Sequence, residues 1–143
     1  MLSGCVLSAD RSSLTISFNA SLLGDDEVQV QSWNRSQHGA SAMEVKLAGD
    51  ANWTFVNVSS LSTTSVTIEK LPVGNVTGVR YAWGDNPCCG DNDRSLEPCP
   101  PMSCPLLTKN SHEPAVPFEA ELVAGKCSCT LPQRCDGPSS FEQ

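Results

Sequence analysis

The sequence predicts an all-β protein, a single antiparallel β-sandwich with a Pro- and Cys-rich, disulfide-stapled C-terminal part. Six short segments alternate apolar and polar residues, and turn residues (Gly, Pro, Asn and Asp) separate them at close spacing. No segment has a convincing periodicity of an amphipathic helix. The 143 residues suffice for about one domain. We place a β-sandwich domain at residues 1–124, including a Pro- and Cys-rich insertion at 87–117, and a Cys-containing tail at 125–143.

The first three predicted strands are residues 14–19, 28–31 and 43–47. In the first of them, Leu14, Ile16 and Phe18 alternate with polar residues and are expected to face the core. Asn19 then falls on the outer side, where a glycan would be tolerated. A turn at residues 24–26 separates the first two strands, since Gly and Asp favour turns.

The fourth predicted strand, residues 53–58, has an ambiguous inner face. If Trp53 and Phe55 point inward, Asn57 shares their side of the strand and could not easily carry a glycan. If Val56 and Val58 point inward, Asn57 is on the outside and could carry one. The sequence leaves both arrangements open.

The last predicted strands are residues 65–68 and 78–84, with residues 118–122 as a further strand that closes a sheet edge. In residues 78–84, Val79, Tyr81 and Trp83 alternate with smaller or polar residues, so this strand is expected to be central to the core. Arg80 points away from that face, so we expect it to pair with a surface or interdomain acid. The sequence Asp-Asn-Pro at 85–87 ends the strand, because Pro cannot donate to a sheet ladder.

Charge and composition exclude several classes of partner. The formal net charge of −7 argues against binding to nucleic acid or to an anionic membrane surface. No run approaches the roughly 18 apolar residues that a membrane span requires. The first residues lack the basic segment and the long apolar core of a signal peptide.

Cysteines and glycosylation sequons point to an oxidising compartment. The chain has eight cysteines, an even number, as expected of a protein with disulfides. Five Asn-x-Ser/Thr sequons occur, at Asn19, Asn34, Asn52, Asn57 and Asn75. Together these features predict a secreted or lysosomal protein.

The cysteine spacing fits disulfides better than zinc. Cys99 and Cys104 are separated by four residues, and Cys127, Cys129 and Cys135 have no matching second pair or nearby histidines. We therefore expect no metal and no cofactor. The acidic residues at 25–27, and those at Asp91, Asp93, Glu97, Glu119 and Glu121, fall in turns or on exposed strand sides, so we expect solvated acids rather than a glycosidase pair.

Five short motifs occur in an order that resembles the C-terminal region of the sialate O-acetylesterase family. They are Val-Arg-Tyr-Ala-Trp at 79–83, Pro-Cys at 87–88, Cys-Pro-Leu at 104–106, Pro-Ala-Val-Pro-Phe at 114–118, and Trp53 followed by residues 58–67. The resemblance covers roughly residues 14 to 122. It implies the non-catalytic C-terminal β-domain of a carbohydrate esterase, which packs on and supports an upstream SGNH-type catalytic domain.

The resemblance transfers no catalytic residue to this chain. Enzymes of the family carry a nucleophile in a Gly-Gln-Ser-like motif and an Asp-x-x-His motif, because the serine needs an oriented histidine as its base. Neither motif is present: the only histidines are His38 and His112, and Arg35 and Lys109 stand three positions before them. We expect both histidines in surface loops, and catalysis only in the parent protein.

The resemblance also implies a disulfide pairing. In the family the Pro-Cys and Cys-Pro elements lie close together, which implies a bond between Cys88 and Cys104 here. The chain carries extra residues between them, including Cys89 and Cys99, and these two could pair within the insertion. Eight cysteines allow 105 connectivities, so the pairing is a hypothesis.

Two other functions are compatible with the sequence. The chain could be a stand-alone extracellular carbohydrate-binding β-domain, with Trp33, Trp53, Tyr81 or Trp83 stacking on a sugar ring and Arg80 pairing with a sialic acid carboxylate. We expect these aromatic residues in the core instead. The Cys-rich tail could also be an interaction or inhibitor module, but only its density of cysteines supports this interpretation.

Overall fold

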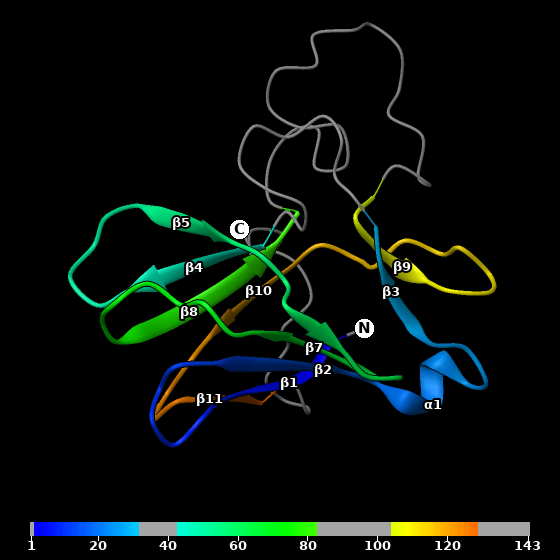
Figure 1. Ribbon diagram of the computed structural model, residues 1–143, viewed down its shortest axis with the longest axis horizontal. Coiled ribbons are helices and arrows are strands. Elements are labelled where there is room, and N and C mark those ends of the chain that lie inside the picture. Colours follow the sequence, from blue (N-terminus) through cyan, green and yellow to red (C-terminus); the bar gives the residue numbers. More distant parts are fainter. Residues whose placement is uncertain (1, 32–42, 83–103, 129–143) are drawn as a thin grey trace, which may run out of the picture.

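The computed structural model describes residues 2–31, 43–82 and 104–128, and this part of the chain is mostly β (Figure 1). Its elements are β1 (Leu2–Leu7), β2 (Leu14–Phe18), α1 (Ala20–Leu23), β3 (Val28–Val30), β4 (Met43–Leu47), β5 (Trp53–Val56), β6 (Ser60–Leu61), β7 (Ser65–Ile68), β8 (Val76–Tyr81), β9 (Leu106–Thr108), β10 (Phe118–Glu121) and β11 (Lys126–Ser128). The strands predicted from the alternation are all present. Two have the expected bounds, four end one or two residues early, and β8 begins two residues early, while the predicted strand end at residues 83–84 lies outside the described residues.

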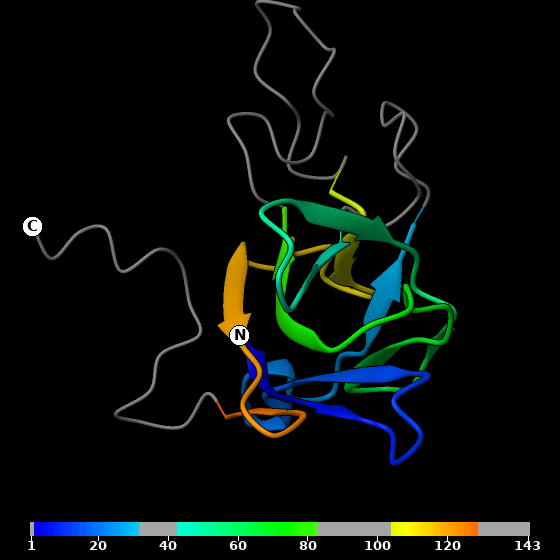
Figure 2. The same cartoon turned by 90° about the vertical axis from the view of Figure 1, so that its left-hand side faces the viewer.

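The strands form three antiparallel sheets. A five-stranded sheet has the order β11-β1-β2-β7-β6, a four-stranded sheet the order β10-β8-β4-β5, and β3 pairs with β9 in a small third sheet. Figure 2 shows the blue strands β1 and β2 on one side and the cyan to green strands β4, β5 and β8 on the other. As predicted for residues 118–122, β10 is at the edge of its sheet.

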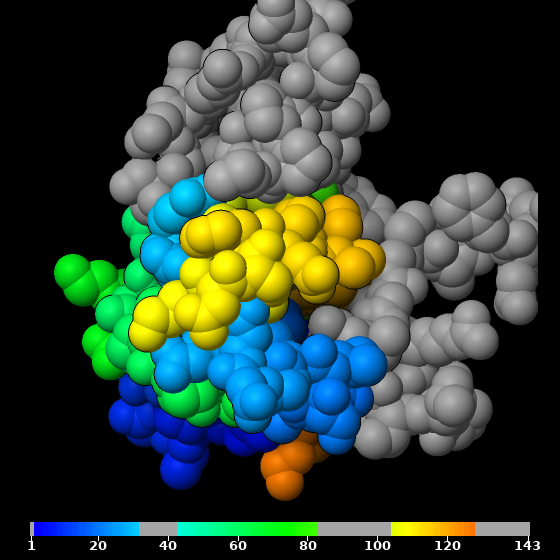
Figure 3. Space-filling view, turned by 90° about the vertical axis from the view of Figure 1, so that its right-hand side faces the viewer, coloured from blue at the N-terminus to red at the C-terminus, as the bar shows by residue number. Residues whose placement is uncertain are grey.

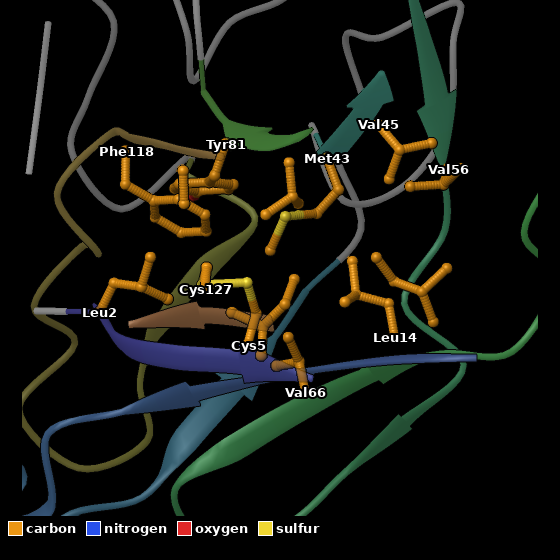
Figure 4. Packing of buried hydrophobic residues seen from close by; sticks show 14 of the residues in the cluster. Leu2, Cys5, Leu14, Met43, Val45, Val56, Val66, Tyr81, Phe118 and Cys127 are labelled. Carbon is orange, nitrogen blue, oxygen red and sulfur yellow. A yellow bond between two sulfur atoms is a disulfide. The ribbon is translucent and has the colours of Figure 1, made fainter. Parts of the chain in front are cut away.

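One hydrophobic cluster joins the two larger sheets. The residues expected to face inward from β2 (Leu14, Ile16 and Phe18) are buried, as are Val79 and Tyr81 of β8. Figure 4 shows side chains from both sheets pointing toward one another within this cluster. Burial of this apolar surface is the main source of stability of such a sheet pair.

The small sheet is attached to the core through the hydroxyl of Tyr81. This oxygen accepts a hydrogen bond from the backbone N–H of Leu106 over 3.0 Å, which connects β8 to β9. Both residues are buried, and burial raises the pKa of the phenol well above its usual range. The Tyr81 ring also packs against Phe118, with 5.8 Å between the ring centroids.

Four strands and one helical turn were not predicted from the sequence. They are β1, β6, β9 and β11, together with α1. In β1 a register shift between Leu2 and Gly4 places Leu2 and Cys5 among the buried residues although they are three positions apart. This bulge breaks the period of two on which strand prediction depends.

A disulfide joins the two ends of the described chain. Cys5 of β1 and Cys127 of β11 are bonded and stand directly opposite each other in the strand register. Residues 126–128, which the sequence analysis assigned to the tail, are therefore an edge strand of the five-stranded sheet. Cys104 is also disulfide-bonded. Its predicted partner Cys88, and the predicted pair Cys89 and Cys99, lie outside the described residues, so these pairings stay predictions.

Candidate functional site

The outer face of the four-stranded sheet carries two rows of functional side chains. The strand register places Glu119, Arg80 and Glu44 in one row. It places Glu121, Gly78, Lys46 and Trp53 in the next row. Most of the residues that alternate with them are buried (Met43 and Val45 of β4, Val79 and Tyr81 of β8, Phe118 and Ala120 of β10), so these two rows face away from the core.

Arg80 and Glu44 form a bidentate ion pair in the first row. Nε of Arg80 donates to Oε2 of Glu44 over 2.7 Å, and a terminal guanidinium nitrogen donates to Oε1 over 2.9 Å. Glu44 is only 5% exposed, so its charge requires such a partner. The sequence analysis expected a surface or interdomain acid, whereas this partner is a buried residue of the neighbouring strand.

Trp53 lies across this face rather than in the core. The guanidinium carbon of Arg80 is 4.4 Å from the centre of the indole, and Nζ of Lys46 is 5.8 Å from it. The ring reaches β8, because a Cβ built on Gly78 would be 3.0 Å from its Cη2 atom. Of the two arrangements left open by the sequence, Val56 is the buried residue and Asn57 is exposed.

A hollow of about 270 Å³ lies beside the indole, over Gly78. Its lining residues are Lys46, Trp53, Thr77, Gly78, Glu119, Ala120 and Glu121. Gly78 has no side chain, and the edge of the Trp53 indole lies beside it where a larger residue would need space. The hollow thus combines an aromatic ring, two exposed carboxylates and one ammonium group.

Sequence reasoning singled out Trp53 and Arg80 but missed the rest of this group. Lys46 and Gly78 were not considered, and Glu119 and Glu121 were treated only as solvated acids. Their one signal in the sequence is that each stands at a polar or small position of an alternating strand. That signal does not say which strands are neighbours.

A second hollow, of about 180 Å³, is apolar and lies on the face shown in Figure 3. It is lined by Phe18, Leu22, Leu23, Val28, Leu106, Leu107, Thr108, Glu113, Pro114, Ala115 and Val116. On this face the blue residues of α1 and β3 meet the yellow and orange residues that follow position 104. Leu22 is 62% exposed and Val116 58% exposed, so the apolar surface extends beyond the hollow itself.

Asp26 ties together the two segments that flank this apolar hollow. Its carboxylate accepts hydrogen bonds from the backbone N–H groups of Asn110 and Ser111, both over 2.9 Å, and from the hydroxyl of Ser111 over 2.8 Å. These hydrogen bonds hold the pKa of Asp26 well below its usual range. Nearby, Lys109 donates to Glu27 over 3.0 Å.

Several residues considered in the sequence analysis lie outside the described residues. They include Trp33, Asn34, Arg35, His38 and Trp83, the acidic residues Asp91, Asp93 and Glu97, and the cysteines Cys129 and Cys135. His112 is exposed in the loop after β9, as expected of a surface histidine. Tyr81 is a core residue, also as expected.

The sequons that the structure describes are accessible to different degrees. Asn52, Asn57 and Asn75 are exposed, and Asn75 accepts a hydrogen bond from Arg11. Asn19 is the N-cap of α1, where its Oδ1 atom accepts a hydrogen bond from the backbone N–H of Ser21. Glycosylation at these positions stays a prediction.

Within residues 2–31, 43–82 and 104–128, no three His, Cys, Asp or Glu side chains gather in a way that could hold a metal ion. The helix in this part of the chain is too short to cross a membrane.

Neither the models of known protein families nor the curated proteins provide a match to this sequence.

Proposed function

We propose that this chain is the non-catalytic C-terminal domain, a β-sandwich, of a secreted or lysosomal protein similar to sialate O-acetylesterase. The order of the five sequence motifs supports the family, and the antiparallel sheets with a buried disulfide are compatible with an extracytoplasmic β-domain. On this proposal the domain packs on and supports an upstream SGNH-type catalytic domain. The chain alone hydrolyses nothing.

The observation that carries the packing role is the position of the apolar hollow. Phe18 lines this hollow and pairs with Leu2, the first residue of β1. A catalytic domain that precedes residue 1 would therefore join the β-domain close to this exposed apolar surface. Exposed side chains such as Leu22 and Val116 would be buried by that contact, as in interfaces between domains of one chain.

The upstream reading frame gives the first test. The proposal requires a domain before residue 1 that contains a Gly-Gln-Ser-like motif and a later Asp-x-x-His motif. A frame without such a domain contradicts the proposal. An acetyl-ester assay on this chain alone should show no turnover, and turnover that a serine-directed inhibitor abolishes would also contradict it.

The docking surface is tested in the full-length protein with the double variant Leu22→Asp/Val116→Asp. Charges in the buried contact should lower the thermal stability of the catalytic domain and shorten its active lifetime. In this chain alone the same variant should unfold like the unaltered protein, because both side chains are exposed. Val73→Asp is the matched control, since Val73 is a fully exposed apolar residue elsewhere. A double variant that behaves like this control refutes the docking role.

A second candidate function, a stand-alone extracellular carbohydrate-binding β-domain, is favoured by the position of Trp53 on the sheet surface. It requires a sugar site in this chain but no upstream enzyme. The reading frame separates the two candidates, because the second predicts no Gly-Gln-Ser-type domain before residue 1.

A further inference from the structure

The hollow over Gly78 has the composition of a sugar-binding subsite. Sugar rings present apolar C–H faces, which pack on aromatic rings, and hydroxyl groups, which donate to carboxylates and accept from ammonium groups. Trp53 supplies the aromatic ring, Glu119 and Glu121 supply acceptors, and Lys46 supplies a donor. We propose that this hollow binds one neutral pyranose ring stacked against Trp53. The inference goes beyond the supporting role proposed for the domain. It names the sugar site that the second candidate function requires, and it does not depend on whether an upstream domain is present.

The indole is held in place before any ligand arrives. Arg80 lies over the ring, and its guanidinium is itself fixed by two hydrogen bonds to the buried Glu44. The far end of the ring lies against Gly78, and since Gly78 and Arg80 both belong to β8, the ring is held over that strand. Such support lowers the entropy that binding would otherwise cost.

The size of the hollow limits the ligand. Its volume of about 270 Å³ lies just below the roughly 300–1,000 Å³ of pockets for drug-sized ligands. A side chain at position 78 would take up the floor, and its Cβ would already stand 3.0 Å from the indole. The space therefore suits a single ring or the end of a glycan chain.

The charges around the hollow select a neutral sugar. Glu119 and Glu121 are exposed carboxylates, Lys46 is one ammonium group, and Arg80 and Glu44 compensate each other. The lining thus has one negative charge in excess. A sialic acid carboxylate would meet like charge there, whereas the hydroxyl groups of an uncharged pyranose would find acceptors.

The test uses this chain and simple glycosides. Methyl glycosides of glucose, galactose, mannose and sialic acid are titrated into the protein while the indole N–H signals are followed by NMR. The Trp53 signal is assigned as the one missing from Trp53→Phe. We expect at least one neutral glycoside to shift that signal in a saturable manner, and the sialoside to bind more weakly than the best neutral one.

Three variants separate the site from general effects on folding. Trp53→Ala and Gly78→Val should each weaken binding of the neutral glycoside about tenfold or more, as expected for loss of an aromatic anchor or of its space. Glu119→Gln/Glu121→Gln should reduce the discrimination against the sialoside. Leu61→Ala, at an exposed apolar residue of β6, is the matched control and should bind like the unaltered chain.

Clear results would overturn the proposal. They are the absence of saturable shifts with every neutral glycoside, tighter binding of the sialoside than of all neutral ones, or unchanged affinity in Trp53→Ala. Far-UV circular dichroism and thermal unfolding show whether each variant is folded. If Trp53→Ala does not fold, the test uses Glu119→Gln/Glu121→Gln, which should fold because both side chains are exposed. In that case, unchanged discrimination between the neutral glycoside and the sialoside contradicts the proposal.

Discussion

Removing the Cys5–Cys127 disulfide should markedly lower the free energy of unfolding of this protein. The bond joins residues 122 positions apart, and its two cysteines are 1% and 7% exposed. The change to make is Cys5→Ala/Cys127→Ala. It removes a cross-link between β1 and β11 without adding a polar group to the core.

The expected magnitude follows from the length of the closed loop. In the chain-entropy model, a loop of about 120 residues contributes about 4.8 kcal/mol at 25 °C. The predicted bond between Cys104 and Cys88 would shorten the free loop in the unfolded chain. Because each halving of a loop lowers the closure entropy by only about 0.6 kcal/mol, about 4 kcal/mol remains. We expect a loss of about 4 kcal/mol in the free energy of unfolding.

Urea unfolding followed by circular dichroism at 25 °C measures this loss. The dependence on urea should also steepen, since the unfolded chain without the cross-link exposes more surface. Cys5→Val/Cys127→Val is the control for packing, because it also lacks the bond but refills more of the lost volume. If both variants lose less than about 1 kcal/mol, the entropic reasoning is wrong. A large loss in the Ala variant alone would assign the effect to a cavity.

Three further predictions concern hydrogen bonds and charges. Tyr81→Phe leaves the buried N–H of Leu106 without its acceptor and should lower the free energy of unfolding by about 1–3 kcal/mol in urea titrations, unless water replaces the hydroxyl. Asp26 has a lowered pKa in the folded state, so its stabilising effect is present above the usual value of 3.8 and is lost as the pH falls through the lowered one. Below pH 3.8, the thermal unfolding temperature of Asp26→Asn should therefore fall less with decreasing pH than that of the unaltered protein. If both proteins show the same pH dependence, the hydrogen bonds to Asp26 do not contribute to stability in this way. Glu44→Leu leaves the Arg80 guanidinium without this partner and should cost about 3 kcal/mol, whereas Glu44→Leu/Arg80→Leu should recover part of that loss. A double variant whose loss equals the sum of the two single losses would show that the pair is not coupled.

The strands with a clean alternation were predictable because their burial follows from local chemistry alone. In β2 every second residue is large and apolar, and these residues are buried, as are Val79 and Tyr81 at the end of β8. In β1 the bulge between Leu2 and Gly4 shifts the alternation, so no sequence window shows a period of two. In β11 only three residues pair, and their partners in β1 lie more than a hundred positions away.

The candidate sugar site was predictable only in part, because its residues come together through strand pairing between distant segments. Trp53 was recognised as a residue that could stack on a sugar, but the two possible faces of its strand were equivalent in the sequence. The burial of Val56 decided between them. Gly78 and Glu119 join Trp53 through a sheet whose strand order cannot be read from the chain.

The sequence by itself determined that this protein is built mainly of strands and which side of β2 and β7 is apolar, because side-chain direction alternates locally. It also determined an even number of cysteines and an excess of acidic residues. Only the tertiary structure decided that Cys5 bonds to Cys127, that Arg80 pairs with Glu44, and that four strands gather around one hollow. Each of these depends on register between segments far apart in the chain, and register is set by the packing of the whole core.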